Sequence, residues 1–439
     1  MLGLIIYIVI IVMLLYMVAK TPVWGVSAVI FLFSIDLWGV IHSRYLMTNS
    51  YIMNVVIGLM VLIAFVKSKT LGTIVKLSND TSWIQILTIG LVCYALLSTL
   101  WSPKGDLAIE KWTTQIPYYI IAIFVVPQLF NKLEDSAALI KSILLLGGLF
   151  LFLFTFMVTW RGRSILSEVG GQPIALPLAV ATSAGIVFLT SVLATSLKGK
   201  LWLIVRISLA ILSILLVFKT SSRGQLLGMF ATAFLLFPFS RRVKNIGAFI
   251  VMAIVFLAIA YLAQVFYEMT QIEDTRWTVD EMNQDLEGRF YASLSLLDHW
   301  VDGGAFSWLF GLGNSASFEP SIVGFYPHCV PVEILGEEGM IGFGMFLAIN
   351  FLTVNRVWQS FRYTKYNFHD RNPLVLLSSY YLYALLLSMK SGALFGSSTM
   401  LLFPILVERC LKLLKPKCFE VMTEAESQTR SDNSKTELF

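Results

Sequence analysis

Charged side chains are scarce in this 439-residue sequence. Asp, Glu, Lys and Arg together make up 13% of it, whereas 57% of the residues are hydrophobic. A soluble domain of this size needs far more polar surface, which excludes a water-soluble globular protein. The net charge of +5 comes from short basic clusters between apolar runs, as in cytoplasmic loops of membrane proteins, so we expect no nucleic acid among its partners.

Cysteine and histidine are also few, with four residues of each. The cysteines show neither paired nor metal-like spacing, which argues against a disulfide framework and a zinc site. We therefore expect no metal and no cofactor. The cysteines are Cys93, Cys329, Cys410 and Cys418.

Long apolar runs are abundant instead. Many of them can cross most or all of about 30 Å of hydrocarbon at ~1.5 Å per residue. They predict an all-α polytopic membrane protein with about 12–13 transmembrane helices and one large extracytoplasmic loop domain. The candidate spans are 2–19, 22–41, 51–66, 84–100, 116–130, 137–159, 174–194, 201–219, 224–238, 246–266, 340–358, 374–390 and 399–414.

The charge pattern divides the chain into four parts. Transmembrane helices fill residues 1–266 and 332–414, a large outer loop with an amphipathic helix fills 267–331, and 415–439 is a disordered cytoplasmic tail. Basic clusters fall beside alternate connections, which are predicted to be cytoplasmic. The opposite parity places the turn at 221–223 and the loop 267–331 together on the outer side.

The outer loop is the most informative feature, since membrane helices need only short turns between them. It carries ten acidic residues, two arginines, two histidines and no lysine. Arg289 opens an apolar-periodic stretch with Phe290, Leu294 and Val301, which predicts an amphipathic helix with Arg289 at its N-terminal end. We expect the chemistry to lie where this loop meets the bilayer.

Three side chains of the outer side are candidates for that chemistry. Arg223, at a helix start, and Arg289 can each offer a planar fork to a phosphate, whereas the alternatives are a snorkelling Arg223 and a salt-bridged Arg289. Arg276 is better explained by salt bridges. His328, near the re-entry of the loop, can take a proton from an attacking hydroxyl, although a lone histidine is more often structural.

The order of these motifs resembles the O-antigen ligase and O-antigen polymerase superfamily of bacterial envelope glycan assembly. The resemblance covers about residues 200–360. It is carried by Ser221-Ser222-Arg223-Gly224, by Arg289 some twenty residues before Phe310-Gly311-Leu312-Gly313-Asn314, and by Tyr326-Pro327-His328 followed by Glu333-Ile334-Leu335-Gly336-Glu337-Glu338-Gly339-Met340-Ile341-Gly342. Cys329 departs from the pattern, because members often have Asn after this histidine.

The resemblance implies a metal-independent, inverting glycosyltransferase of the bacterial inner membrane with its active site facing the periplasm. The donor is a glycan on undecaprenyl pyrophosphate, and the acceptor is another glycan or lipid A-core. Arg223, Arg289 and His328 are then catalytic. Arg223, Arg289, Arg276 and Tyr326 bind substrate. Membrane lipid and other polysaccharide-assembly proteins are the further partners implied.

The sequence leaves two choices open. A polymerase joins repeat units and a ligase passes the finished polymer to lipid A-core, and the Tyr326-Pro327-His328 context slightly favours the polymerase. The alternative is a transporter or flippase of lipid-linked oligosaccharides, which would use the unexplained Asp36 and Arg206 within spans. Such a transporter predicts inverted repeats and broken helices in matching halves, which the sequence does not show.

Overall fold

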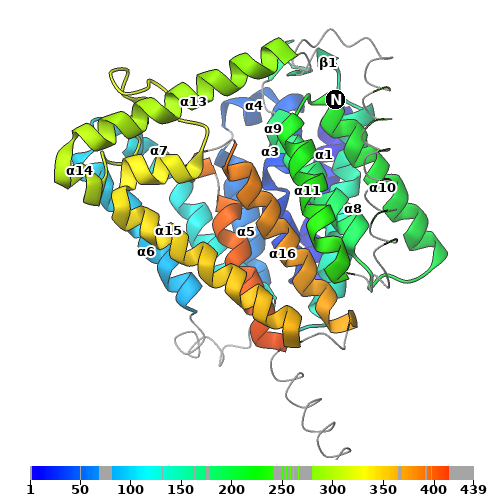
Figure 1. Cartoon of the computed structure of the whole chain (residues 1–439). Helices are drawn as coiled ribbons and strands as arrows, with labels where there is room; N and C mark the ends of the chain where they lie inside the picture. Colours follow the sequence, from blue (N-terminus) through cyan, green and yellow to red (C-terminus); the bar gives the residue numbers. More distant parts are fainter. Residues whose placement is uncertain are drawn as a thin grey trace, which may run out of the picture.

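The computed structural model is almost entirely helical, and its helices pack side by side (Figure 1). Between positions 241 and 278 it describes isolated residues alone, so Arg276 and the predicted span 246–266 lie outside the described residues, as does the tail 415–439. The described segments are 2–49, 51–68, 82–130, 132–240, 279–363, 368–390 and 393–414, without positions 162, 163, 170, 172, 175, 176 and 397.

Six described helices are long and apolar enough to cross a membrane, and a bent pair makes a seventh. Their surfaces expose large apolar side chains, such as Leu201 at 72% and Phe351 at 70%, which suits contact with lipid. The six are α1 (Leu2–Lys20), α5 (Tyr51–Ser68), α6 (Trp83–Ser98, extended to Trp101 by η2), α8 (Asp135–Phe156), α10 (Lys200–Lys219) and α15 (Val330–Tyr363).

This number is smaller than the 12–13 spans expected, because several apolar runs form shorter, less apolar or broken helices. The predicted span 22–41 is α2 (Trp24–Ile30) and α3 (Leu32–His42), which meet at Phe31 with a bend of 62°. The predicted span 116–130 begins inside α7 (Gly105–Ile120) and continues as a π turn and a 3₁₀ turn, η3 (Ile121–Val125) and η4 (Val126–Leu129). Pro117 and Pro127 remove backbone donors there, which breaks the helical ladder.

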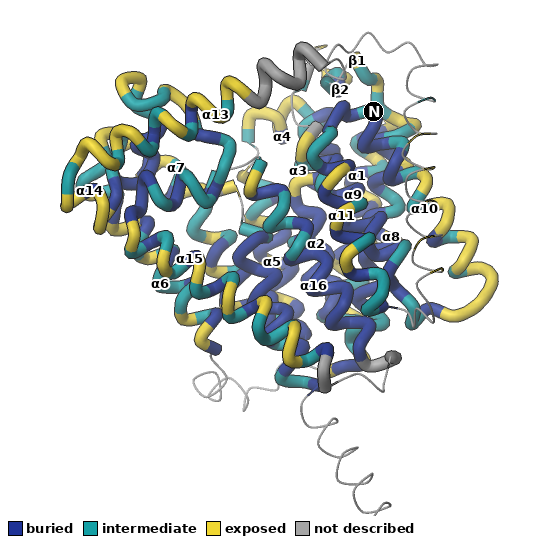
Figure 2. Tube along the Cα trace, viewed as in Figure 1, coloured by how far each residue is buried: buried dark blue, intermediate teal, exposed yellow. Residues whose placement is uncertain are grey.

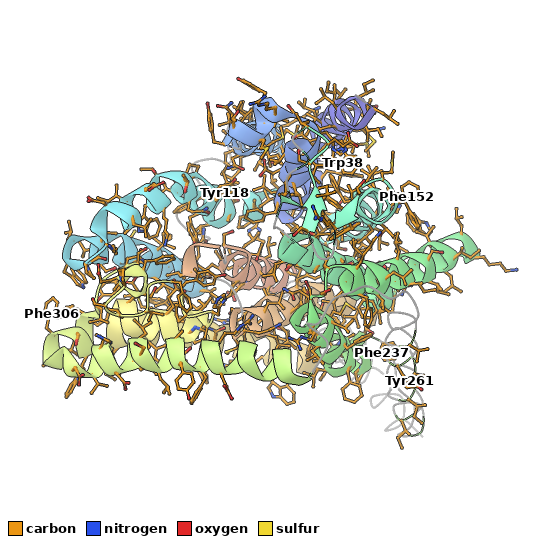
Figure 3. The ribbon with its side chains drawn as sticks, turned by 90° about the horizontal axis from the view of Figure 1, so that it is seen from above. Trp38, Tyr118, Phe152, Phe237, Tyr261 and Phe306 are labelled. Carbon is orange, nitrogen blue, oxygen red and sulfur yellow. The ribbon has the colours of Figure 1, made fainter. Side chains whose placement is uncertain are left out.

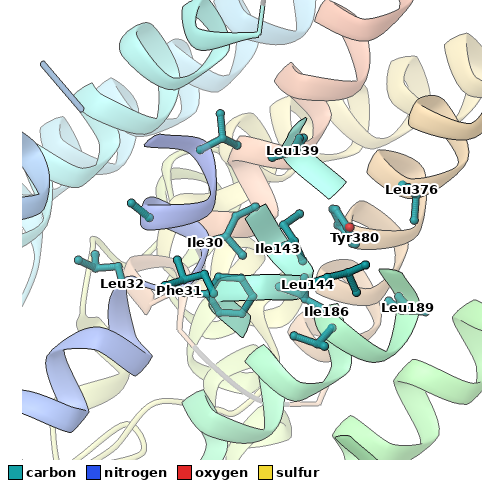
Figure 4. Packing of buried hydrophobic residues seen from close by; sticks show 14 of the residues in the cluster. Ile30, Phe31, Leu32, Leu139, Ile143, Leu144, Ile186, Leu189, Leu376 and Tyr380 are labelled. Atoms are coloured by element: carbon teal, nitrogen blue, oxygen red, sulfur yellow. The ribbon is translucent and has the colours of Figure 1, made fainter. Parts of the chain in front are cut away.

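Two buried clusters form the core. The larger one joins α1 to α5 with α8, α9 (Pro177–Leu193), α10, α11 (Arg223–Ser240), α16 (Phe368–Ser388) and residues 402–414. The break at Phe31 is part of it, and Figure 4 shows Phe31 among residues of α8 and α9. The smaller cluster joins α6, α7 and α15 with the short turn η7 (Leu394–Gly396). Figure 2 shows that buried residues are concentrated in the central helices, and that exposed residues lie mainly at the periphery.

Three short antiparallel strands qualify the all-α prediction. They are β1 (Trp160–Arg161), β2 (Ser164–Leu166) and β3 (Pro173–Ile174), with Trp160 opposite Ile165 and Ile165 opposite Ile174.

The described part of the loop 267–331 lies across one end of the helices (Figure 1). It contains α13 (Val279–Asp302), α14 (Gly304–Phe310) and the 3₁₀ turn η6 (Ala316–Phe318), and α13 packs on α15. Seen from above, α13 runs along one edge of the molecule, from near Phe306 toward Phe237 (Figure 3).

The structure forms a helix here, α13, but it begins at Val279 rather than at Arg289, and it has apolar side chains on both its buried and its exposed face. Arg289 lies in the middle of α13, because the polar residues before it continue the helix. Phe290 is 62% exposed and Val301 49%, whereas Ala292 and Leu296 are buried. Arg289, Ala292 and Leu296 share one helical face at spacings of three and four residues, so Arg289 is on the face that meets the protein.

Candidate functional site

Arg289 joins α13 to the end of α16. Its Nη1 donates a hydrogen bond of 2.9 Å to the carbonyl oxygen of Lys390, and the guanidinium is half-buried. This contact spans 101 positions of the chain. It places Arg289 beside a lysine that the sequence analysis did not select as a site residue.

Lys390 in turn lies against the start of α11, where Arg223 is. A Cβ built on Gly224 would be 2.5 Å from Lys390 Nζ and 2.9 Å from its Cε. Gly224 follows Arg223 directly, so the side chain of Lys390 crosses the backbone from which Arg223 extends. Three basic residues from three helices, Arg223, Arg289 and Lys390, therefore gather at one end of the bundle.

The turn before α11 explains why this helix starts where it does. Ser221 has a left-handed backbone (φ 51°), and both Ser221 and Ser222 are buried, at 3% and 4% exposure. The amides of Ser221 and Ser222 close the preceding helix on the carbonyls of Phe218 and Val217. The first turn of α11 also holds Gln225, which is 1% exposed and whose amide atoms have no hydrogen-bond partner among the described residues.

His328 lies one helical turn of α13 away from Arg289. Ser293 follows Arg289 by four positions, about 6 Å along the helix, and its Oγ donates to the carbonyl of Pro327 at 3.4 Å. The His328 ring packs on Tyr326 with centroids 4.2 Å apart. His328 has φ 59°, a conformation that is uncommon for residues other than glycine and is frequent at functional sites.

Cys329 follows the candidate base His328 directly in the chain. Burial raises the pKa of its thiol, with a smaller contribution in the same direction from Glu333 and an opposing one from the Val332 amide. The thiol therefore stays protonated at neutral pH, which makes it a poor nucleophile. Cys329 is accordingly a packing residue next to the candidate base.

Three buried glutamates of α15 hold the loops of this site together. Glu333 accepts a 3.0 Å bond from the Leu394 amide, which fixes the segment after Lys390. Glu337 accepts bonds from the amides of Ser315 and Ser317 and from Ser317 Oγ, and Glu338 accepts one from Asn314 Nδ2. The three are 1–3% exposed, and sequence reasoning used them only as part of the motif. Acidic residues inside an apolar helix are the signal that could have found them.

Two glycine motifs pack directly on each other beside these glutamates. The amides of Leu312 and Gly313 donate to the carbonyls of Gly336 and Glu337, each at 2.9 Å. Gly339 interrupts α15 with φ 64° and ψ −166°. A Cβ on Gly311 would be 2.5 Å from the Gly339 amide nitrogen. This close backbone packing gives the reason for the glycines of both motifs.

We expect Gly339→Ala to destabilise the fold by about 3 kcal/mol, because this backbone region is nearly exclusive to glycine and the new methyl meets backbone atoms. A Cβ there would be 2.5 Å from the Leu309 carbonyl oxygen. Thermal unfolding of the detergent-purified variant measures the effect. Gly344→Ala is the matched control on the same helix, since its Cβ meets nothing within 4 Å. Equal unfolding midpoints for the two variants would contradict this explanation.

Two cavities lie near or within the bundle. One of about 120 Å³ adjoins the end of α16 that carries Lys390, with Leu387, Ser388 and Thr399 in its wall. A larger one of about 670 Å³ lies between α3, α5 and α7. Asp36 lines it, with a buried Oδ1 that has no hydrogen-bond partner among the described residues.

The structure brings the backbone at Arg223 and Gly224 close to Lys390, which Arg289 also contacts. Ser293 of α13 contacts the carbonyl of Pro327, the residue before His328. Arg276 lies outside the described residues. No three His, Cys, Asp or Glu side chains within the described segments are grouped as metal ligands. Arg206, unexplained by the sequence, is buried and donates to the carbonyls of Ser191 and Val192, which is a structural role.

A scan against models of known protein families finds no match, and a search of curated proteins finds no similar sequence.

Proposed function

We propose that this protein is a membrane glycosyltransferase that moves a glycan from a polyprenyl-pyrophosphate carrier to an acceptor sugar, as a surface-polysaccharide polymerase or as an O-antigen ligase. The observation that supports it best is the Arg289–Lys390–Gly224 contact, which gathers cations from α13, α16 and α11. The nearby His328 adds a base. A site with several cations and one base suits departure of a pyrophosphate and attack by a hydroxyl.

In the proposed reaction, the acceptor oxygen attacks the anomeric carbon of the donor glycan while the bond to the pyrophosphate oxygen breaks. His328 takes the proton of the acceptor hydroxyl. Arg223 and Arg289 neutralise the charge that develops on the leaving pyrophosphate. The displacement inverts the anomeric centre, and the products are the extended glycan and polyprenyl pyrophosphate.

The sidedness of the proposal is supported by charge. Lys20 ends α1 and Lys67 lies in the last turn of α5, at the ends that Figure 1 places away from α13. Positive residues mark the cytoplasmic side of membrane proteins. The site under α13 then faces the periplasm of a bacterial inner membrane, where an activated lipid has to supply the energy.

The direct test supplies purified protein in liposomes with an undecaprenyl-pyrophosphate-linked glycan. We expect release of undecaprenyl pyrophosphate with glycan transfer. A second lipid-linked repeat as the effective acceptor identifies a polymerase, which the Tyr326-Pro327-His328 context favours, whereas lipid A-core as the acceptor identifies a ligase. Absence of bond formation with either acceptor would refute the proposal.

A second candidate function is transport of lipid-linked oligosaccharides. It is favoured by the broken span at Phe31 and by Asp36 in the cavity of about 670 Å³, since interrupted helices and buried charges mark transport sites. Its test is movement of the lipid-linked glycan between leaflets without glycosidic bond formation, and loss of that movement in Asp36→Asn. If the protein forms glycosidic bonds and Asp36→Asn does so as fast as wild type, transport is excluded as the activity.

A further inference from the structure

The end of α16 is fixed from three sides. Arg289 of α13 donates to the carbonyl of Lys390, Glu333 of α15 accepts the amide of Leu394, and the hydroxyl of Tyr119 on α7 donates to the carbonyl of Leu394 at 2.7 Å. Glu333 and Tyr119 are both buried, at 3% and 2% exposure. Buried side chains that hold a short segment on both faces give its lysine a defined position.

The side chain of Lys390 fits where it is because residue 224 has no side chain. A Cβ on residue 224 would lie 2.5 Å from Lys390 Nζ and 2.9 Å from its Cε, so a larger residue would collide with the lysine side chain. Gly224 is the second residue of α11 and lies in its first turn. The close approach of the Lys390 side chain explains why residue 224 is a glycine.

Basic residues from three segments of the chain come together here. Lys390 lies over the first turn of α11, the positive end of the helix dipole, and beside the backbone of Arg223. Its own carbonyl holds Arg289. An arginine binds phosphate oxygens as a planar fork, whereas a lysine adds a compact charge on a flexible stem, so the two are complementary ligands for the several oxygens of a pyrophosphate.

We infer that Lys390 is a third phosphate-binding residue of the donor site, and that Gly224 exists to let its ammonium reach that place. This inference rests on the proposed function, since the pyrophosphate it binds is the carrier's leaving group. Arg223 and Arg289 supply forks, and Lys390 supplies a point charge at the start of α11.

The test measures binding of undecaprenyl pyrophosphate and of undecaprenyl monophosphate to purified protein in nanodiscs. Lys390→Gln should weaken binding of the pyrophosphate lipid by about 10- to 100-fold, as for loss of one charge-assisted contact, and Lys390→Arg should restore most of it. Binding of the monophosphate lipid should change less. Lys104→Gln, whose lysine pairs with Glu319 at 3.2 Å, is the control and should bind as wild type.

A double-mutant cycle tests the role of Gly224. Gly224→Ala should weaken pyrophosphate binding about as much as Lys390→Gln, but should have little further effect in a Lys390→Ala background, where the stem is gone. Additive effects would overturn the assignment, as would wild-type binding by Lys390→Gln at an unchanged unfolding midpoint. If wild-type protein itself does not bind the pyrophosphate lipid, the proposed function fails, and this inference fails with it.

Discussion

Replacing His328 with asparagine is expected to lower turnover by about 10²- to 10⁴-fold, the range for loss of a general base. Asparagine is the appropriate substitute because it tolerates the left-handed backbone that position 328 adopts (φ 59°). Alanine there would mix a lost base with backbone strain. Donor binding should change little, since the phosphate-binding cations are on other elements.

The control for this variant is His299→Asn. His299 is exposed on α13, and its Nδ1 lies 2.8 Å from the carbonyl oxygen of Ser295, so its loss should leave turnover within about twofold of wild type. Turnover is measured as release of undecaprenyl pyrophosphate by purified protein. Wild-type turnover in His328→Asn would remove the proposed base, whatever the fate of the arginines.

Replacing Arg289 with alanine should lower turnover by about 10²- to 10³-fold, the effect of losing one preorganised stabiliser of developing charge. The Arg289→Ala variant loses two interactions, and both losses should lower turnover. The fork on the leaving pyrophosphate is lost, and the carbonyl of Lys390 loses its 2.9 Å donor. Arg223→Ala should have an effect of similar size through the first loss alone.

Arg289→Lys separates charge from geometry. A lysine keeps the charge but lacks the planar fork, so we expect recovery of only part of the lost turnover. Arg44→Ala, at an exposed arginine of the short helix α4 (Arg44–Thr48), is the control and should match wild type. Full activity of Arg289→Lys would show that charge alone suffices at this position, and full activity of Arg289→Ala would contradict the site.

Local sequence patterns predicted much of the fold but not its irregularities. Uninterrupted apolar runs became α1, α5, α8 and α10 because their length and composition leave one stable solution in lipid. The bend at Phe31 has no proline or glycine next to it from which it could be predicted. It depends on packing against α8 and α9, where Ser27 bonds Ser142 at 2.6 Å and Ser34 bonds Ser183 at 2.8 Å. The local hydrophobic periodicity of the sequence does not predict such long-range pairs.

The candidate site also combines residues that local sequence can suggest with a residue whose role depends on long-range contacts. Arg223, Arg289 and His328 could be proposed from the sequence because each is an isolated polar group next to an apolar run or in the long polar insert. Lys390 could not, because its meaning comes from a carbonyl contact with Arg289 and from space left by Gly224, both distant in the chain. The sequence also placed the start of this helix at Arg289, whereas α13 begins at Val279.

The central claim is that guanidinium groups and one imidazole at the outer rim do the work that a divalent ion does in other transferases. The most direct measurement is undecaprenyl pyrophosphate release by purified protein after exhaustive chelation, with and without added Mg²⁺, for wild type and Arg289→Ala. The account predicts full wild-type turnover in chelator and no rescue of Arg289→Ala by Mg²⁺. Loss of wild-type turnover in chelator, restored by Mg²⁺, would contradict it.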